Sequence, residues 1–407
     1  MANREILNNT IDLNNKYPVD DMAISINQDG RVLSKFSDDY WNLSNFVRGY
    51  STNPNLDFSE DGTGLNKETL IHLRLIILYI LFYENGRKDI LSFTVIREKY
   101  RIYKVLAQFF KGKKFLDLTC GFGIDAYFLS QNFEEITLIE QNTELLEIVK
   151  NNWEILDRKA NFINQQLEDF LESNQEKFDL IYLDPARRDN NNRKVFLLED
   201  LSPNIVEIQE KLGEISDEIL IKLSPLIDLQ HLVSSLDNIS KIWIIAVKNE
   251  VKEVLIHIKK TDEKTEISCV NLQSLEPEFN FTLNTEKNCK SEFSIPKKYI
   301  FIPNNSVLKS GAFNLVSEKF NLKKLHQNTH IYTSEKLIED FPGRIFEAEE
   351  LNPKEIKKGE KFNIITKNYP LKPEEIKKKY KIKDGGEDYL IFSQSSQNKH
   401  ILKAKLL

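Results

Sequence analysis

The stretch Lys114-Phe115-Leu116-Asp117-Leu118-Thr119-Cys120-Gly121-Phe122-Gly123-Ile124-Asp125 decides the fold of this chain. Its residues 115–118 are mostly apolar and predict a short buried strand that holds one acid. Gly121 and Gly123 predict a tight turn, where the backbone bends sharply and a ligand can come close. We expect a helix to follow and Asp125 to cap it rather than contact a cofactor, because a carboxylate is favoured in the first turn. A strand, a glycine turn and a helix in this order are typical of a nucleotide-type cofactor site.

Polar residues also follow three later apolar runs. These are Glu140 after residues 136–139, Gln166 after residues 162–163, and Asp184-Pro185 after residues 178–183. Glu140 follows Asp117 by 23 positions, close to the roughly 20-residue spacing at which an acid meets a ribose diol in βαβ nucleotide sites. The carboxyl ends of parallel strands meet at one edge of a sheet, so we expect these side chains to form one site.

Strands and helices alternate over residues 113–272, which predicts a parallel, doubly wound α/β sheet. Later strands are expected at 219–223, 242–247 and 267–272, with a helix over 251–258 between the last two. The count is then about seven strands. Position 126 is Ala, so the turn lacks the third glycine of a dinucleotide site, and hydride transfer is disfavoured.

Four regions are expected along the chain. Residues 1–110 are predicted to be mainly helical, 111–275 to form the α/β domain, 276–302 to be a connector, and 303–407 to form a small α+β domain. Within the connector, residues 279–283 are strand-like. In the last region we expect helices over 307–320 and 373–380 and strands over 363–366, 389–392 and 401–402.

The composition is that of an ordinary globular protein, with 41% hydrophobic and 29% charged residues among 407. The net charge of −6 means that any nucleic-acid surface must be local. Three widely spaced cysteines fit neither a disulfide framework nor a zinc site and suit a reducing cytoplasm. Cys120 is expected to be a small buried residue. The cysteine usage leads us to expect a cytoplasmic protein without a metal. The stretch 70–82 is too short to span a bilayer, so we expect no membrane partner.

The polar strand ends resemble those of class I S-adenosylmethionine-dependent methyltransferases. The series Asp117-Leu118-Thr119-x-Gly121-x-Gly123-x-Asp125-Ala126 is similar to that of small-subunit ribosomal RNA guanine-N2 methyltransferases. Segments 184–189, 193–200, 340–346 and 382–390 resemble a bacterial group of methyltransferases with a THUMP-like C-terminal domain. The resemblance covers about residues 111–407. It implies a Rossmann-like seven-stranded sheet with an antiparallel last strand, and a THUMP-like domain at residues 303–407.

The resemblance also implies S-adenosyl-L-methionine as the cofactor. Asp117 would order its amino-acid end, or cap the turn's own amides. Glu140 would accept from both ribose hydroxyls, since a carboxylate has two acceptor oxygens. Gln166, where the family usually has Asp, and the Leu167 amide would face the adenine. The cofactor-binding residues expected on this basis are Asp117, Thr119, Gly121, Gly123, Glu140, Gln141, Gln166, Leu167 and Asp184.

Asp184 and Pro185 are the expected catalytic residues. Methyl transfer to an exocyclic amine needs acceptors that hold the amine hydrogens, so that the nitrogen lone pair points at the methyl group. Proline stiffens the end of the strand and helps to hold the Asp184 carbonyl in place. Amine methyltransferases of this kind commonly have Asn/Asp-Pro-Pro-aromatic here, whereas this chain has Asp-Pro-Ala-Arg. The methylated atom is therefore left open.

Structured RNA, ribosomal or transfer, is the expected substrate. The polar loop after Asp184 carries Arg187, Arg188, Arg193 and Lys194, which are placed to contact phosphate or are simply solvated. In the C-terminal domain we expect an RNA-docking surface, or alternatively a solvated basic face, formed by Arg344, Lys323, Lys324, His326, His330 and the lysines at 367, 372, 377–379, 381 and 383.

Two other functions remain open. The chain could be an RNA- or protein-binding module that keeps the fold with little turnover, or a methyltransferase for a protein or small molecule. The target nucleotide, the oligomeric state and the role of residues 1–110 do not follow from the sequence.

Overall fold

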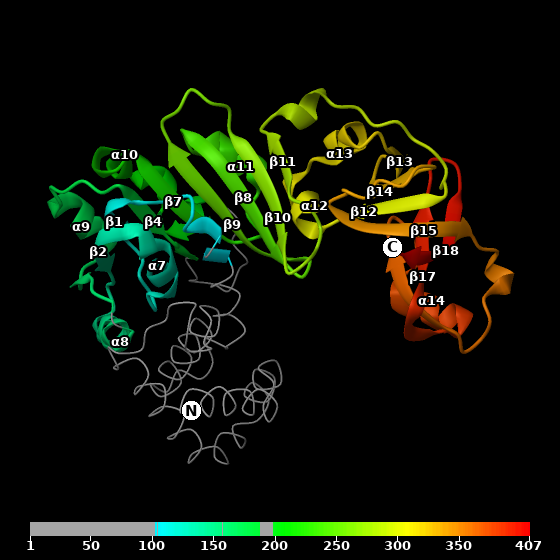
Figure 1. The fold of residues 1–407 in the computed structure, drawn as a ribbon, viewed down its shortest axis with the longest axis horizontal. Coiled ribbons are helices and arrows are strands. Elements are labelled where there is room, and N and C mark those ends of the chain that lie inside the picture. Colours follow the sequence, from blue (N-terminus) through cyan, green and yellow to red (C-terminus); the bar gives the residue numbers. More distant parts are fainter. Residues whose placement is uncertain (1–101, 104, 157, 188–197) are drawn as a thin grey trace, which may run out of the picture. The chain divides into compact units, whose positions relative to one another are not determined.

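The computed structural model describes residues 102–103, 105–156, 158–187 and 198–407. Most of the predicted helical region 1–110 lies outside this part, as do Arg188, Arg193 and Lys194. Figure 1 shows the two large sheets that the described residues form. A third, two-stranded sheet pairs β5 (Ala186–Arg187) with β6 (Leu201–Ser202).

The first sheet has nine strands in the order β11-β10-β8-β9-β7-β4-β1-β2-β3. Their bounds are β1 Gly112–Asp117, β2 Phe133–Ile139, β3 Asn161–Ile163, β4 Leu180–Leu183, β7 Glu218–Leu223, β8 Ile239–Val247, β9 Glu250–Lys259, β10 Glu266–Leu272 and β11 Phe279–Thr282. Strand β1 pairs in parallel with β2 and β4, and β2 pairs in parallel with β3. The carboxyl ends of these four strands therefore lie at one edge.

Helices connect the strands of this sheet, as the alternating pattern predicted. They are α7 Ile124–Leu129, α8 Thr143–Ile155, α9 Leu167–Ser173, α10 Ile205–Ile215 and α11 Leu229–Ser235. The strands are apolar and the core is aliphatic and aromatic; Phe115, Leu116, Ile181 and Leu183 are completely buried. The predicted doubly wound α/β class is confirmed, with β10 and β11 added at the edge of the seven-stranded arrangement.

The predicted helix over 251–258 is wrong, because these residues form strand β9. Strand β9 is antiparallel to β8, with Val247 opposite Glu250. The two-residue turn between them is Lys248-Asn249, and both residues have positive φ (49° and 65°), as in a type I′ hairpin. The antiparallel strand of the seven is therefore β9, whereas residues 267–272 form β10, parallel to β8. A short β-branched run cannot be assigned by periodicity alone.

The second sheet has seven strands in the order β13-β14-β12-β15-β18-β17-β16. They are β12 Tyr299–Pro303, β13 Lys323–His326, β14 Thr329–Ser334, β15 Gly343–Glu350, β16 Lys361–Thr366, β17 Lys383–Gln394 and β18 Lys399–Leu406. The helices are α12 Asn305–Ser310, α13 Phe313–Lys319 and α14 Pro373–Tyr380. The last matches its prediction. The helix expected over 307–320 is two helices instead, because Gly311 adopts φ 77° and ends α12.

The hairpin tip at Asn249 meets α12 through asparagine side chains. The Asn305 backbone N–H donates to Asn249 Oδ1 at 2.7 Å, and Asn305 Nδ2 donates to the Asn249 carbonyl at 2.6 Å. The Asn249 N–H in turn donates to Asn271 Oδ1 at 2.8 Å. This contact fixes the start of α12 against the end of the β8–β9 hairpin.

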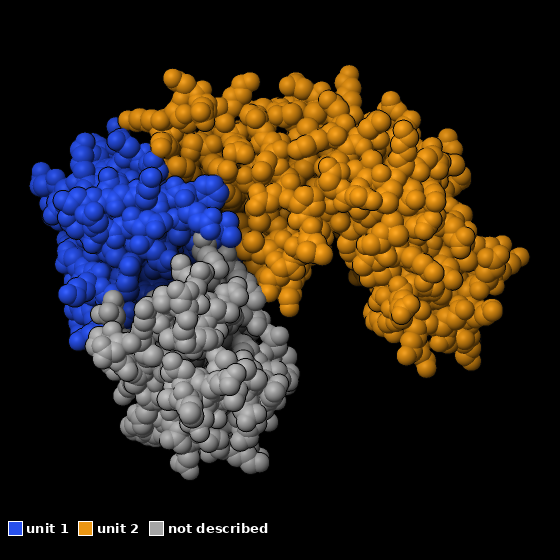
Figure 2. Space-filling model, in the orientation of Figure 1, with its two compact units in different colours: residues 1–186, 207–220 blue, residues 187–206, 221–407 orange. Residues whose placement is uncertain are grey.

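The chain divides into two compact units, residues 1–186 with 207–220 and residues 187–206 with 221–407, shown in separate colours in Figure 2. Strand β7 spans the boundary. The predicted domain boundaries stay a prediction. Within the described ranges, we find no helix with the length and apolar character needed to cross a membrane.

Candidate cofactor and catalytic site

The glycine turn after β1 is built from two glycines with different roles. Gly121 and Gly123 have φ values of 53° and 68°, which side chains rarely adopt. A Cβ at Gly123 would lie 2.7 Å from Val149 Cγ1 and 2.8 Å from Trp153 Nε1. At Gly121 the nearest atom would be the Thr119 carbonyl oxygen, 3.8 Å away. Gly123 therefore packs the turn against α8, whereas Gly121 leaves an open surface over the backbone.

Glu140 closes the turn from the end of β2. Its Oε2 accepts the Gly121 N–H at 2.9 Å, and its Oε1 accepts the Asn142 N–H at 2.8 Å. The carboxylate is half-buried. Each oxygen keeps capacity for a further donor, because an ionised carboxylate has about four lone-pair sites. Glu140 thus both shapes the turn and offers acceptors beside it.

Asn164 is a residue of this edge that the sequence analysis missed. Its Nδ2 donates to the carbonyls of Glu140 (2.8 Å) and Gln141 (3.1 Å), and its Oδ1 accepts from Thr143 Oγ1 at 2.8 Å. The side chain ties the end of β3 to the end of β2. Its position in the polar run 164–166, directly after a strand, was the available signal.

Gln166 and Leu167 lie where β3 leads into α9. Gln166 is the residue before the helix, has extended backbone angles and does not cap the helix with its side chain. The side chain is exposed, whereas that of Leu167 is buried. The exposed amide group of Gln166 and the first backbone N–H of α9 therefore lie beside the same edge as Glu140.

Thr119 links the glycine turn to the end of β4. The Asp184 backbone N–H donates to Thr119 Oγ1 at 2.7 Å. One residue earlier on the turn, the Leu118 N–H donates to the Tyr182 carbonyl at 3.1 Å. Asp117 is buried, and its Oδ1 accepts the Thr119 N–H at 2.9 Å. Asp117 therefore does stabilise the turn's own amide, and Asp184 lies directly beside that turn.

Asp125 does not act as the expected helix cap. Gly123 is the N-cap of α7 and has no side-chain cap hydrogen bond. The buried Asp125 carboxylate accepts from the hydroxyl groups of Tyr182 (2.9 Å) and Tyr103 (3.2 Å) instead. Tyr182 lies on β4 and Tyr103 precedes β1, so sequence spacing could not predict these contacts.

Cys120 is buried in the turn. Burial raises the pKa of its thiol well above the ordinary value, and the neighbouring Asp117, Glu140 and Asp125 raise this pKa further. A thiol held neutral is a poor nucleophile, which agrees with the predicted structural role. The described residues contain no group of three His, Cys, Asp or Glu side chains that could hold a metal ion.

The predicted substrate residues lie in several places. Pro185 is buried and Asp184 is half-buried at the end of β4, and the backbone of Arg187 lies in β5. Arg344 is half-buried in β15, with its guanidinium carbon 5.7 Å from the centre of the Phe346 ring. Arg188, Arg193 and Lys194 are outside the described residues.

Two residues of the predicted basic surface are not exposed cations. Lys324 is buried, its Nζ donates to the Gln327 carbonyl at 3.1 Å, and burial lowers its pKa. His330 stacks on Phe313 with ring centres 3.5 Å apart. Burial, together with Lys324 and Lys367, lowers the pKa of His330 to about 4. At neutral pH His330 is uncharged.

A group of exposed basic side chains lies on α14 and in the segments directly before and after it. Lys377 is paired with Glu374 and Asp384. The neighbouring exposed lysines, which form no ion pair with the described residues, are Lys367, Lys372, Lys378, Lys379, Lys381 and Lys383. We call these six residues the α14 lysine surface.

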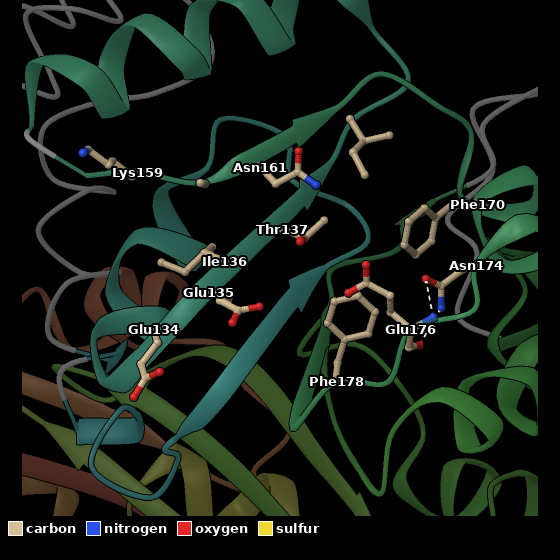
Figure 3. A pocket seen from close by; sticks show the side chains of 12 residues that line it. Glu134, Glu135, Ile136, Thr137, Lys159, Asn161, Phe170, Asn174, Glu176 and Phe178 are labelled. Atoms are coloured by element: carbon tan, nitrogen blue, oxygen red, sulfur yellow. Dashed lines mark hydrogen bonds between the residues drawn. The ribbon is translucent and has the colours of Figure 1, made fainter.

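One cavity of about 390 Å³ lies away from the cofactor edge (Figure 3). It is lined by the first half of β2, including Glu134 and Thr137, by Lys159 and Asn161 before and at β3, and by Phe178 before β4. The lining also includes Ile163 at the end of β3 and Phe170 of α9, but none of the residues expected to bind the cofactor or the substrate. The cavity is thus distinct from the candidate site.

The residues at the carboxyl edge fit S-adenosylmethionine. The donor and acceptor set contains a half-buried carboxylate at Glu140, an exposed amide at Gln166, and a turn with an open backbone face at Gly121. A carboxylate accepting two hydroxyl groups and a glycine backbone that a ligand can approach closely are what a nucleoside cofactor requires.

Family models match three parts of the chain. Residues 93–211 match the family described as conserved hypothetical protein 95, which is a methyltransferase family. Residues 299–342 match a ferredoxin-like domain, and residues 343–404 match a THUMP domain-like family. The search of curated proteins gives no significant match.

One solved structure is similar along nearly the whole chain, and others are similar over about two fifths of it. A provisionally assigned methyltransferase from Porphyromonas gingivalis W83 is 25% identical, with 91% of this chain and 98% of that chain covered and a TM-score of 0.69. An rRNA methylase from Streptococcus thermophilus is 14% identical, covering 41% of this chain and 97% of its own, with a TM-score of 0.30. TrmK from M. capricolum, solved with S-adenosyl-homocysteine, is 15% identical over 40% of this chain and 69% of its own, with a TM-score of 0.31.

Proposed function

We propose that this chain, an S-adenosylmethionine-dependent methyltransferase with a THUMP-like C-terminal domain, methylates an amine of a base in structured RNA. The observation that carries the proposal is the hydrogen bond between the Asp184 N–H and Thr119, because it sets an amine-orienting Asp-Pro beside the cofactor turn. RNA from the ribosome or transfer RNA is the proposed class of substrate.

The chain's own residues hold the cofactor by complementary hydrogen bonds. Glu140 would accept from the ribose hydroxyls with the lone pairs that the backbone amides of Gly121 and Asn142 leave free. Gln166 and the Leu167 N–H would contact the adenine. Gly121 would let the amino-acid end lie against the backbone, next to Asp117 and Thr119, and Gln141 and Gly123 complete the turn.

When bound, the cofactor supplies an electrophilic methyl group. The Asp184 carbonyl and carboxylate accept the two hydrogens of the amine, which turns the nitrogen lone pair toward that methyl group. Transfer of the methyl group would replace the S–C bond by an N–C bond, and the nitrogen would then have one proton to lose. The Asp184 carboxylate is the proposed acceptor of this proton. Pro185 restricts Asp184 to extended backbone conformations and so limits the directions of both groups.

The α14 lysine surface supports an RNA substrate. Six exposed ammonium groups within 17 positions, 367–383, provide a local positive surface on a chain with a net charge of −6. Ammonium groups that neutralise phosphates supply most of the sequence-independent affinity for RNA. Arg344, Arg187, Arg188, Arg193 and Lys194 are proposed as further contacts.

A protein or small-molecule amine is the alternative substrate. It is favoured by one observation: Ala186, which follows Asp184-Pro185, is exposed and has no ring on which a base could stack. Methylation of RNA that persists when proteins are removed from the assay would exclude this alternative.

Calorimetric titration of S-adenosylhomocysteine and S-adenosylmethionine tests the cofactor site. We expect micromolar binding by the wild type, weakened by about 10- to 100-fold in Glu140→Ala through loss of charge-assisted hydrogen bonds. Glu134→Ala removes an exposed carboxylate from the other end of β2 and should bind like the wild type. If the wild type bound neither S-adenosylhomocysteine nor S-adenosylmethionine, the cofactor assignment would be refuted.

Glu140 also holds the turn together, so the loss in Glu140→Ala has two possible sources. Glu140→Gln keeps one acceptor oxygen. Its melting temperature reports damage to the turn, and its affinity for the cofactor reports loss of the ribose contacts, so the two measurements separate the two sources. Transfer of labelled methyl groups to total RNA from a strain lacking the gene then tests the substrate. Labelling of that RNA by the wild type, and not by Asp184→Ala, is expected.

A further inference from the structure

The hydroxyl group of Thr119 has a partner that its place in a cofactor turn does not require. It accepts the backbone N–H of Asp184 at 2.7 Å, a short distance for an N–H···O bond. The two residues are 65 positions apart and lie at the ends of neighbouring parallel strands, β1 and β4. Both are half-buried, so the bond lies at the border of the site.

We infer that the Thr119 hydroxyl is a positioning group, which sets the direction of the Asp184 acceptors without contacting the reacting atoms. This inference rests on the proposed methyl transfer. It gives Thr119 two separable parts: its backbone belongs to the cofactor turn, while its side chain acts on Asp184.

Two constraints act on opposite sides of the Asp184 Cα. Pro185 excludes helical conformations of the residue before it and so restricts the ψ angle of Asp184. The Thr119 hydroxyl fixes the peptide plane between Leu183 and Asp184 through its N–H. Together they restrict the direction of the Asp184 carbonyl and of the Cα–Cβ bond from which the carboxylate extends. With either constraint alone, the backbone of Asp184 would have more conformational freedom.

Hydrogen bonds to the glycine turn and to α7 also hold Tyr182, near the end of β4. The Leu118 N–H donates to the Tyr182 carbonyl, and the Tyr182 hydroxyl donates to Asp125 on α7. Tyr182 and Asp125 are buried. The segment from Tyr182 to Asp184 is therefore attached to the glycine turn and its helix at three points, and Thr119 is the attachment nearest to the proposed chemistry.

Threonine suits this role better than its close analogues. A β-branched side chain has few χ1 rotamers, so its oxygen is held in place before the reaction. Valine has nearly the same shape and lacks the acceptor. Serine keeps the acceptor and loses the branching. The pair Thr119→Val and Thr119→Ser therefore separates the hydrogen bond from the packing.

The experiment compares wild type, Thr119→Val, Thr119→Ser and Thr137→Val, the last a control in β2 beside the distant cavity. In Thr119→Val we expect kcat on the deletion-strain RNA to fall at least about tenfold, with KM for RNA and the Kd of S-adenosylhomocysteine within about threefold of wild type. Thr119→Ser should recover most of kcat. Thr137→Val should behave as wild type.

Hydrogen exchange at the Asp184 amide, measured with S-adenosylhomocysteine bound, tests the bond without any substrate. We expect protection to fall about tenfold in Thr119→Val and to return in Thr119→Ser. Unchanged protection would overturn the inference even if the wild type methylated no RNA. A Kd weakened as much as kcat would also overturn it, since the hydroxyl would then serve cofactor binding. Absence of RNA methylation by the wild type refutes only the proposed substrate.

Discussion

Some residues at the cofactor edge have two roles: they hydrogen-bond to the backbone of the turn and are proposed to contact the cofactor. A single substitution at such a residue therefore changes both interactions at once. Glu140 accepts two backbone amides of the turn and is also the proposed ribose acceptor. Asp117 caps the Thr119 amide. Such residues were identifiable from the sequence because they follow apolar strands. Their hydrogen bonds to the backbone of the turn could not be predicted from the sequence, because they depend on how the strands pair.

His330 should make the stability of the chain depend on pH. Its folded-state pKa of about 4 is below the unfolded value of about 6.5. The unfolded chain therefore binds more protons between these values, and stability falls as the pH drops from about 6.5 toward 4. Its contribution is fully present above pH 6.5. Thermal melts at several pH values should show a shallower acid loss in His330→Phe, which keeps the stacking on Phe313.

Gln327→Ala is the control for this test, because it alters an exposed side chain without a titratable group in the turn between β13 and β14. Its melting temperature should follow the wild-type dependence on pH. If His330→Phe and wild type lose stability in parallel, the imidazole is not the group that titrates.

At the scale of elements, the packing of the glycine turn on α8 decides which substitutions the fold accepts. Gly123→Ala should destabilise the protein by about 2–4 kcal/mol, because it adds left-handed backbone strain and overpacking against Val149 and Trp153. Gly213→Ala in α10 meets nothing within 4 Å and should stabilise by up to about 1 kcal/mol. Denaturant unfolding of both variants measures the difference. Equal effects would contradict the assigned packing.

Elements were predicted well from the sequence where a polar residue ended an apolar run. They were predicted poorly where the spacing of apolar residues fitted both a helix and a strand. Strands β1, β2 and β4 and helix α14 were expected within a few residues of their observed bounds. Strand β9 was taken for a helix, because Val251, Val254, Leu255 and Ile258 also fit helical spacing and the Lys248-Asn249 turn carries no glycine. The tyrosine partners of Asp125 depended on tertiary packing alone.

For the whole molecule, the distribution of charge matters more for RNA binding than the net charge does. Replacing Lys378, Lys379, Lys381 and Lys383 together by glutamine should weaken RNA binding and reduce the slope of log K against log salt by about 0.7 for each lost phosphate contact. The Kd of S-adenosylhomocysteine should not change. Filter binding at several salt concentrations measures the slope.

Lys260→Gln with Lys264→Gln provides the comparison, since both lysines are exposed and lie between β9 and β10, in a different sheet. Their loss should leave the slope near the wild-type value. An equal reduction per replaced lysine in both sets would mean that RNA is held by diffuse charge rather than by the α14 lysine surface.

The β8–β9 hairpin has a consequence for the order in which the chain folds. Its strands are joined by two residues, so they can pair within about 1–10 μs, before distant parts of the chain have met. Pairing of β1 with β4 must first close a loop of more than 60 residues, which costs more chain entropy. Because α12 attaches to the hairpin tip at Asn249, a hairpin formed early would give the emerging C-terminal sheet a ready-made surface on which to assemble during synthesis.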